Sequence, residues 1–212
     1  MGVLGMRFIQ SWSYACASYV SSQMNETHEK RRVYYYGFQV IIASLVKGFL
    51  LVAFAALTGS FAATISVMLS FASLRVIAGG YHMNTYGKCA TMSVGLFVIL
   101  GCIAQYTYRL WNLPFLMAFI ILSLLLSSIL LFKWAPRDNP GRPITDPLEI
   151  KKFRSLSVVY LLIWCALVSI LTYFNYYLYS LAICFGLLME AFIITPVAFS
   201  LLDKISKKVE SR

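Results

Sequence analysis

A histidine and a cysteine lie seven positions apart in a polar segment between two long apolar runs. His82 is one of two histidines in the 212 residues, and Cys89 is one of five cysteines. A cysteine attacks a carbonyl carbon as its thiolate, and imidazole, with an ordinary pKa of about 6.5, is a base that can generate the thiolate near neutral pH. The pair therefore predicts a cysteine nucleophile with a histidine base.

The chain between these two residues has to turn if their side chains are to meet. A continuous helix over residues 82–89 would separate them by about 10.5 Å along its axis, which is beyond hydrogen-bond reach. Gly79 and Gly80 offer a break, because glycine adopts the backbone conformations that end a helix. We therefore expect one helix to stop at these glycines and a second helix to begin before Cys89.

The start of this second helix supplies further groups. Asn84 or Thr85 has a side chain suited to capping the N-terminus of this helix. Cys89 would then lie about one turn inside the helix, where the helix dipole and Lys88 both favour a thiolate. No acidic residue lies near this segment in the sequence. An acidic group that orients the histidine would therefore have to come from elsewhere in the fold.

Three ionisable residues lie within apolar runs, where such groups are costly and are functional candidates. Arg75 is two helical turns before His82. It is a candidate for holding a substrate carboxylate or oxyanion, with contact to lipid phosphate as the alternative. Lys47 and Glu190 lie at similar depths in their segments, and we expect them to form an intramembrane pair that lowers the cost of both charges.

The composition is that of a membrane protein. Hydrophobic residues make up 60% of the chain and charged residues 12%, against about 45 to 50% apolar residues in soluble proteins. The net charge of +10 suits an anionic membrane face or an acidic peptide. Nucleic acid is not expected as a partner, because no compact nucleic-acid-binding motif accompanies the basic residues.

Neither a metal nor another cofactor is expected. Two histidines, one of them His28 near the N-terminus, supply too few ligands for a metal site, and Walker-type glycines are absent. The cysteines form no C-x-x-C pair, so a disulfide framework is not expected. We interpret the four cysteines other than Cys89 as small buried side chains. They are Cys16, Cys102, Cys165 and Cys184.

Six apolar segments are long enough, at about 20 residues each, to cross a bilayer. They are residues 37–58, 60–78, 89–108, 113–132, 156–173 and 176–202. The sequence therefore predicts an all-α, polytopic membrane protein with six transmembrane helices. The sequence has no evident internal repeat at a fixed period, so it does not suggest an inverted-repeat transporter.

Two regions lie before the first predicted span. Residues 3–22 carry apolar side chains at helical spacing, largely opposite a polar face that includes Ser21. This pattern predicts an amphipathic helix at the membrane surface, with packing on the rest of the protein as the equal alternative. Residues 23–36 read as a charged, solvated connector. The predicted domains are the N-terminal helix and connector, the transmembrane catalytic domain and a basic tail, over residues 1–36, 37–202 and 203–212.

The basic residues predict the orientation. The N-terminal region, the turn at Lys88, the connection 133–155 and the C-terminal tail carry most of them on one side, whereas the opposite loops hold only Arg109. By the positive-inside rule, both termini and the turn with His82 are cytoplasmic. The connection 133–155 reads as a turn-rich basic loop, which is either a solvated linker or a grip for an acidic partner.

These features resemble the AgrB family, the membrane peptidases of accessory gene regulator quorum sensing in Gram-positive bacteria. The resemblance rests on Arg75, Gly79-Gly80, His82, Thr85 and Cys89, in that order and spacing. It extends to Ala135-Pro136, Arg142-Pro143-Ile144 and Thr195-Pro196, and so covers nearly the whole chain.

The resemblance implies a thiol protease of the bacterial cell membrane with Cys89 as nucleophile and His82 as base. Its substrate would be an AgrD-type propeptide with an amphipathic leader, a short central peptide and an acidic C-terminal tail. Release of the tail would leave a thioester, which closes to a thiolactone, or to a lactone with a substrate serine. Members of the family usually act as homodimers. The residues that would bind substrate or shape the site are Arg75, Gly79, Gly80, Thr85, Lys88 and Arg142.

Two other functions remain open from the residues themselves. A small membrane transporter or exporter of peptides would use Lys47, Glu190 and Arg75 to line a path, with no covalent chemistry. A membrane scaffold would bind a partner through the basic loop and would be indifferent to substitution of His82 or Cys89.

Overall fold

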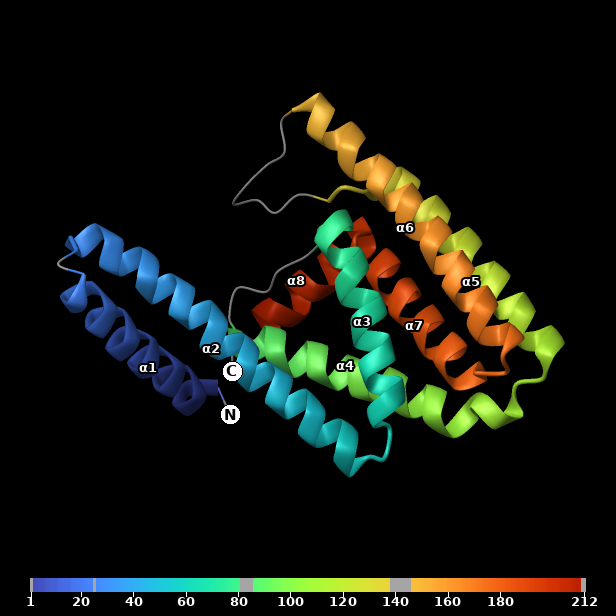
Figure 1. The fold of residues 1–212 in the computed structure, drawn as a ribbon, viewed down its shortest axis with the longest axis horizontal. Helices are drawn as coiled ribbons and strands as arrows, with labels where there is room; N and C mark the ends of the chain where they lie inside the picture. The colour runs from blue at the N-terminus through green and yellow to red at the C-terminus, as the bar shows by residue number, and fades with distance from the viewer. Residues whose placement is uncertain (1, 25, 81–85, 138–145, 211–212) are drawn as a thin grey trace. The chain divides into compact units, whose positions relative to one another are not determined.

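The computed structural model describes residues 2–24, 26–80, 86–137 and 146–210, and the regular secondary structure within these ranges is helical (Figure 1). The elements are α1 (Gly2–Gln23), α2 (His28–Leu57), α3 (Phe61–Ala78), α4 (Tyr86–Thr107), the 3-10 helix η1 (Tyr108–Leu110), α5 (Leu113–Trp134), α6 (Pro147–Tyr173), α7 (Tyr177–Ile193) and α8 (Pro196–Glu210). The chain forms two compact units, residues 1–54 with 84–95 and residues 55–83 with 96–212. Each unit is described by itself.

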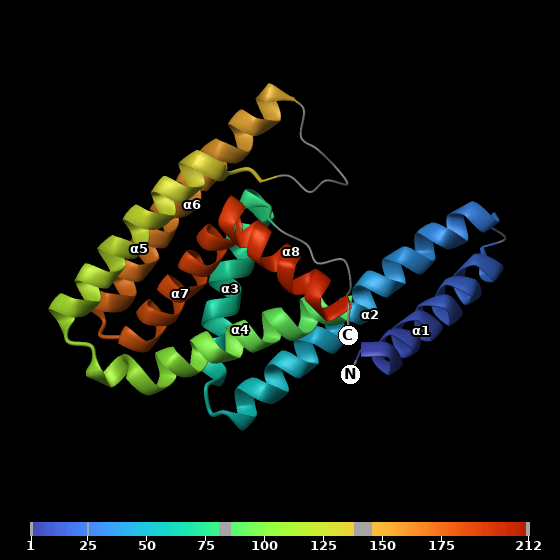
Figure 2. The same ribbon diagram turned by 180° about the vertical axis from the view of Figure 1, so that it is seen from behind.

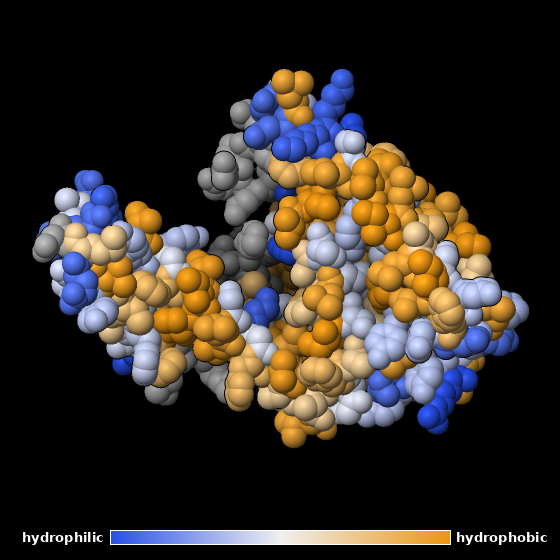
Figure 3. Space-filling view, viewed as in Figure 1, coloured by the Kyte–Doolittle hydropathy of each residue, from blue (hydrophilic) through white to orange (hydrophobic). Residues whose placement is uncertain are grey.

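The helices confirm an all-α protein built to cross a membrane. Within the described ranges, five helices are long and apolar enough to span a bilayer, namely α2, α3, α4, α5 and α6, and the bent pair α7 and α8 adds a sixth if it makes one crossing. Apolar side chains face outwards on α5 and α6, where orange covers much of the visible surface in Figure 3. Ile129 and Leu162, for example, are 61% and 66% exposed. Such surfaces are stable in lipid and not in water.

In the first unit, α1 and α2 lie side by side (Figures 1 and 2). The buried stripe of α1 includes small residues at four-residue spacing, Ser13, Ala17 and Ser21. Tyr14 of α1 packs edge-on against Tyr35 of α2, with ring centroids 6.4 Å apart. Ser21, which the sequence pattern placed on the polar face of this helix, is therefore buried. Small side chains such as these let two helices approach closely.

A second face of α1 remains uncovered in this unit. Phe8, Trp12 and Tyr19 are exposed by 53%, 57% and 68%, and the rings of Phe8 and Trp12 contact each other at 5.6 Å. Both expected features of the helix are thus present, packing on a neighbour and an outward apolar face. Aromatic side chains of this kind suit the membrane interface.

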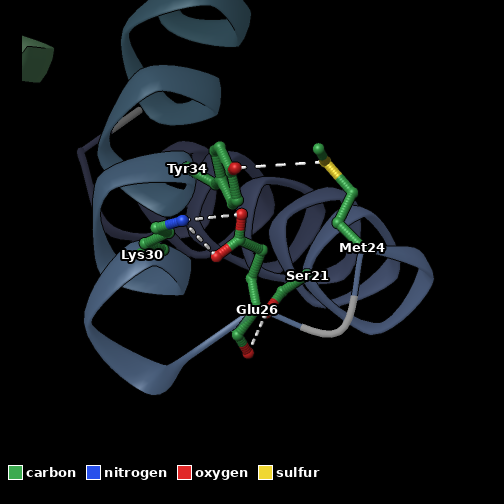
Figure 4. A network of polar contacts seen from close by, with 5 residues as sticks. All are labelled: Ser21, Met24, Glu26, Lys30 and Tyr34. Carbon is green, nitrogen blue, oxygen red and sulfur yellow. Dashed lines mark hydrogen bonds and ion pairs between the residues drawn. The ribbon is translucent and has the colours of Figure 1, made fainter.

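The predicted connector over residues 23–36 is much shorter in the structure, because α2 begins at His28. His28 itself is exposed. Figure 4 shows the local contacts: Lys30 Nζ lies 2.6 Å from Glu26 Oε2, and Tyr34 Oη donates to Met24 Sδ at 4.0 Å. Oppositely charged residues four apart stabilise a helix. The charges that read as a linker therefore help to begin α2.

In the second unit, α7 packs against α3 and α5, and α6 lies along α5 (Figures 1 and 2). The crossing of α3 and α7 is close, since a Cβ on Gly186 would collide with the carbonyl oxygen of Val67. Ser70 Oγ donates to the Ile183 carbonyl at 2.9 Å, and Tyr160 Oη of α6 donates to the Ser70 carbonyl at 2.8 Å. Small residues and interhelical hydrogen bonds are the usual means of packing helices in lipid.

The second half of α4 packs on α3 within the same unit. The rings of Phe71 and Phe97 lie 5.1 Å apart, and a Cβ on Gly101 would collide with the side chain of Thr64. Together with α7, this contact fixes the direction in which α3 runs towards its glycine end.

The predicted basic loop over residues 133–155 is partly helical, which corrects its later half. Helix α6 begins at Pro147, where Asp146 Oδ1 accepts a hydrogen bond from the Leu148 N–H at 2.9 Å. An aspartate N-cap followed by proline is a strong helix start. The exposed residues Lys151, Lys152 and Arg154 therefore lie on the first turns of a helix rather than in a loop.

The predicted last span over residues 176–202 is two helices. Helix α7 ends at Ile193, and α8 leaves it at 83°. Thr195 Oγ1 accepts a hydrogen bond from the Ala198 N–H at 3.2 Å, so Thr195 caps α8, and Pro196 takes its first position. Hydropathy continues across this bend, which is why an apolar window alone reads the segment as one span.

Candidate functional site

The first element of the site is the turn that ends α3. Gly79 caps the helix with φ of 76° and donates its N–H to the Arg75 carbonyl at 3.0 Å. Gly80 follows with φ of 137°. Both values lie in the region that favours glycine. The prediction that these two glycines break the helix is confirmed.

A short segment after α5, residues 135–137, lies directly against this turn. The N–H of Arg137 donates to the Ala78 carbonyl at 2.8 Å, and the N–H of Gly80 donates to the Arg137 carbonyl at 3.2 Å. A Cβ on Gly79 would collide with the same Arg137 oxygen. The backbone contact therefore requires glycine at this position, for reasons of space as well as of φ.

Beneath the turn lies an ion pair between α3 and α7. Arg75 Nη1 is 3.3 Å from Glu190 Oε2, and the two residues are 115 positions apart. The side chain of Glu190 is fully buried, whereas that of Arg75 is 21% exposed. A Cβ on Gly80 would lie 2.6 Å from Arg75 Nη1. The guanidinium thus lies directly under the backbone of Gly80.

The pair explains how a carboxylate is tolerated inside an apolar helix. Removing a carboxylate from water without a partner costs several kcal/mol, and a close cation offsets much of that cost. In the structure, the partner of Glu190 is Arg75. Lys47 belongs to the other unit, so its expected pairing with Glu190 stays a prediction.

A cationic side chain links this site to α8. The guanidinium carbon of Arg137 lies 4.6 Å from the ring centroid of Phe199, a distance typical of cation–π contact. Figures 1 and 2 show the end of α3 beside the junction of α7 and α8. Segments around Gly79, Arg137 and Phe199, distant in sequence, therefore meet at one end of the second unit. No sequence signal pointed to Arg137 itself, although the neighbouring Ala135-Pro136 belongs to the pattern described above.

Cys89 is the fourth residue of α4 and lies in its first turn. It has a free thiol and is half-buried, and its carbonyl accepts a hydrogen bond from Ser93 Oγ at 2.6 Å. The expected position about one turn inside the second helix is confirmed. Among the other four cysteines, only Cys184 is buried, which corrects the expectation of four buried thiols.

The remaining candidates fall outside what the structure describes. His82, Thr85 and Arg142 lie in segments not described, and Lys88 is in α4 but its side chain is not described. Their roles stay predictions. Within the described ranges, no group of three or more His, Cys, Asp or Glu side chains could hold a metal ion.

Fold and site together define the class: an all-α, multi-pass membrane protein with a free cysteine in the first turn of a helix that follows a glycine break. Residues 13–194 match the model of the family described as accessory gene regulator B, AgrB. The chain belongs to the AgrB family.

Curated relatives agree with this assignment. The chain is 29% identical over 172 residues to accessory gene regulator protein B of Staphylococcus intermedius, covering 80% of this chain and 84% of the relative. It is 25% identical over 171 residues to a putative AgrB-like protein 2 of Clostridium perfringens, covering 79% of each. It is 27% identical over 181 residues to the protein FsrB of Enterococcus faecalis, covering 82% of this chain and 70% of the relative. No solved protein structure matches the chain.

Proposed function

We propose that this protein is a membrane cysteine endopeptidase of peptide quorum sensing. It removes the acidic C-terminal tail of an AgrD-type propeptide and promotes closure of the remaining peptide to a thiolactone, or to a lactone where the substrate offers a serine. The observation that carries the proposal is the position of Cys89 in the first turn of α4, within the range matched by the AgrB family.

The proposed chemistry begins with proton transfer from Cys89 Sγ to the imidazole of His82. The thiolate attacks the carbonyl carbon of the last residue of the central peptide, forming an S–C bond. The C–N bond then breaks, and the imidazolium gives its proton to the departing amine of the tail. The product is a thioester between the peptide and Cys89.

Ring closure follows by exchange of one thioester for another. A cysteine thiol within the peptide attacks the carbonyl carbon, its proton passes to His82, and Cys89 leaves as a thiolate. One S–C bond forms and one breaks, so the step is close to balanced in energy. Exclusion of water is therefore important, because hydrolysis of the thioester would compete.

The basic residues support a cytoplasmic reaction. We place both termini, Cys89 and the exposed basic residues Lys151, Lys152 and Arg154 on the cytoplasmic side of the bacterial membrane. A net charge of +10 would attract the acidic tail, and an amphipathic leader would lie on the membrane beside the site. In this proposal Thr85, Lys88 and Arg142 shape the site or hold the tail, and the protein acts as a homodimer.

The test uses the full chain in lipid vesicles and the AgrD-type precursor encoded beside it. We expect wild-type protein to release the acidic tail. Cys89→Ala and His82→Ala should release none while remaining inserted in the vesicles, because each lacks one member of the reacting pair. Cys165→Ala, which removes a half-buried thiol in α6, is the matched control and should retain tail release. Full tail release by Cys89→Ala would reject the proposal.

A further inference from the structure

Glu190 lies in the last turn of α7, 110 residues after the glycine break in sequence but in contact with it in space. We propose that Glu190 is a positioning residue. Through Arg75 it fixes the conformation of Gly80, from which the chain continues to His82. The catalytic consequence rests on the proposed function, whereas the structural part rests on contacts within the second unit alone.

The Glu190 carboxylate is costly to bury in the membrane. Glu190 is the charged side chain of an otherwise apolar helix, and it is fully buried. A charged group inside a membrane helix is expensive and persists where it has a partner and a role. The partner of its Oε2 is Arg75 Nη1, at 3.3 Å. Its second oxygen, Oε1, has no hydrogen-bond partner among the described residues.

Both side chains of the ion pair contact the glycine turn. A Cβ on Gly80 would lie 2.6 Å from Arg75 Nη1 and 3.4 Å from Glu190 Oε1. Both members of the ion pair therefore lie against the same glycine. On its other side, the guanidinium carbon of Arg75 lies 5.5 Å from the ring centroid of Phe71. The ion pair therefore packs against Gly80, and the ring of Phe71 packs against Arg75 from behind.

The turn is also held from the side opposite the ion pair. The N–H of Gly80 donates to the Arg137 carbonyl, and the N–H of Arg137 donates to the Ala78 carbonyl. Gly80 is thus held between a backbone segment and the ion pair. Without the charge of Glu190, a long arginine side chain tends to reach towards water or lipid phosphate. Gly80 would then lose its contact with the ion pair and keep the backbone hydrogen bond to Arg137.

The structural test is amide hydrogen exchange of the full chain in lipid nanodiscs. Glu190→Gln and Arg75→Gln should each speed exchange of the Gly79, Gly80 and Arg137 amides at least tenfold. Ser180→Ala is the matched control, because Ser180 is an equally buried polar residue of α7. It should change these three amides by less than twofold.

A double variant tests whether Glu190 acts through Arg75. If it does, Arg75→Gln/Glu190→Gln should exchange no faster than either single variant, because the second substitution removes nothing further. Unchanged exchange in Glu190→Gln, or two effects that multiply in the double variant, would overturn the proposal. Glu190→Asp keeps the charge and should exchange more slowly than Glu190→Gln. Equal exchange of these two variants would likewise count against it.

The catalytic test measures tail release at several precursor concentrations. Glu190→Gln should lower kcat at least tenfold and change KM less than threefold, because a displaced turn affects the reacting geometry more than precursor binding. Glu190→Asp should retain more activity, and Ser180→Ala should match the wild type. An unchanged kcat in Glu190→Gln would contradict the inference. If wild-type protein releases no tail, the proposed function fails, and the exchange measurement alone decides the role of Glu190.

Discussion

Helix α7 has a buried polar contact near each end, and the two contacts differ in kind. Near its start, Ser180 Oγ lies 3.0 Å from Thr172 Oγ1 of α6, a neutral contact between residues eight positions apart. Near its end, Glu190 pairs with Arg75, a charged contact between residues 115 positions apart. We call these the hydroxyl end and the charged end of α7.

The difference separates a contact that holds a turn from one that prepares a site. Two hydroxyl groups satisfy each other at little cost and join consecutive helices. An ion pair buried in an apolar helix carries a large desolvation cost, so it is weak evidence for stability and stronger evidence for a role. Among the described residues of α7's surroundings, the charged end alone also has a glycine turn with a backbone segment packed against it.

The hydroxyl end also has a cavity, and its lining differs from the chemistry of the charged end. A cavity of about 330 Å³ lies at the hydroxyl end, beside Met117, Thr172 and Tyr177. The described residues that line it include no thiol, imidazole, carboxylate or ammonium group. This cavity therefore offers no groups for covalent catalysis among its described lining residues.

The largest expected effect is a loss of unfolding free energy when the charged end of α7 is disrupted, compared with the hydroxyl end. Arg75→Leu leaves the Glu190 carboxylate buried without its cation, which should cost about 3 to 5 kcal/mol of unfolding free energy. Arg75→Leu/Glu190→Leu removes both charges and should recover most of that loss in stability, while tail release should stay at least about tenfold below that of the wild type. Denaturant unfolding in micelles measures the first and a tail-release assay the second. A loss for Arg75→Leu no greater than that for Ser180→Ala would erase the distinction.

The next effect concerns the turn at the charged end. Gly79→Ala forces a side chain towards the Arg137 carbonyl at a positive φ, which should cost about 1 to 3 kcal/mol and reduce tail release strongly. Gly48→Ala is the control, because a Cβ there meets nothing within 4 Å in the described ranges. It should leave stability unchanged or raise it by up to about 1 kcal/mol, as alanine favours helix. Equal stability of the two variants would show that the turn can relax.

A smaller effect is expected where α8 joins the charged end. Thr195→Ala removes the hydroxyl that caps α8 and should cost about 1 kcal/mol. Because Phe199 of α8 contacts Arg137, tail release should fall modestly, and Thr195→Ser should restore it. Thermal unfolding and the tail-release assay measure the two. Full activity in Thr195→Ala would separate α8 from the site.

The smallest effect is expected at the hydroxyl end. Ser180→Ala removes one neutral contact and should cost about 1 kcal/mol, with tail release within twofold of the wild type. The same unfolding and release measurements apply. A large loss of tail release in this variant would mean that chemistry depends on both ends of α7.

Local signals in the sequence predicted the elements well. The glycine pair predicted the end of α3, and the first turn of α4 contains Cys89 as expected. The bend at Thr195-Pro196 also had a signal, because a hydroxyl residue before proline is typical of a helix start. Hydropathy outweighed it in the prediction of a single span.

Contacts between distant helices could not be predicted in the same way. Position within an apolar segment gives depth in the membrane, and equal depth suggested Lys47 as the partner of Glu190. It does not give the direction in which each helix faces its neighbours, and so it did not predict the contact of Glu190 with Arg75. The pairing of Glu190 with Lys47 stays a prediction. The contact of Arg137 with the glycine turn is likewise a backbone contact that no residue pattern announces.

The most direct test of the proposed chemistry is mass spectrometry of the protein after brief mixing with precursor in lipid vesicles. We expect the peptide that contains Cys89 to gain the mass of the precursor without its acidic tail, in a form that hydroxylamine removes. Tail release with no such adduct, and with undiminished rate in Cys89→Ala, would contradict the account.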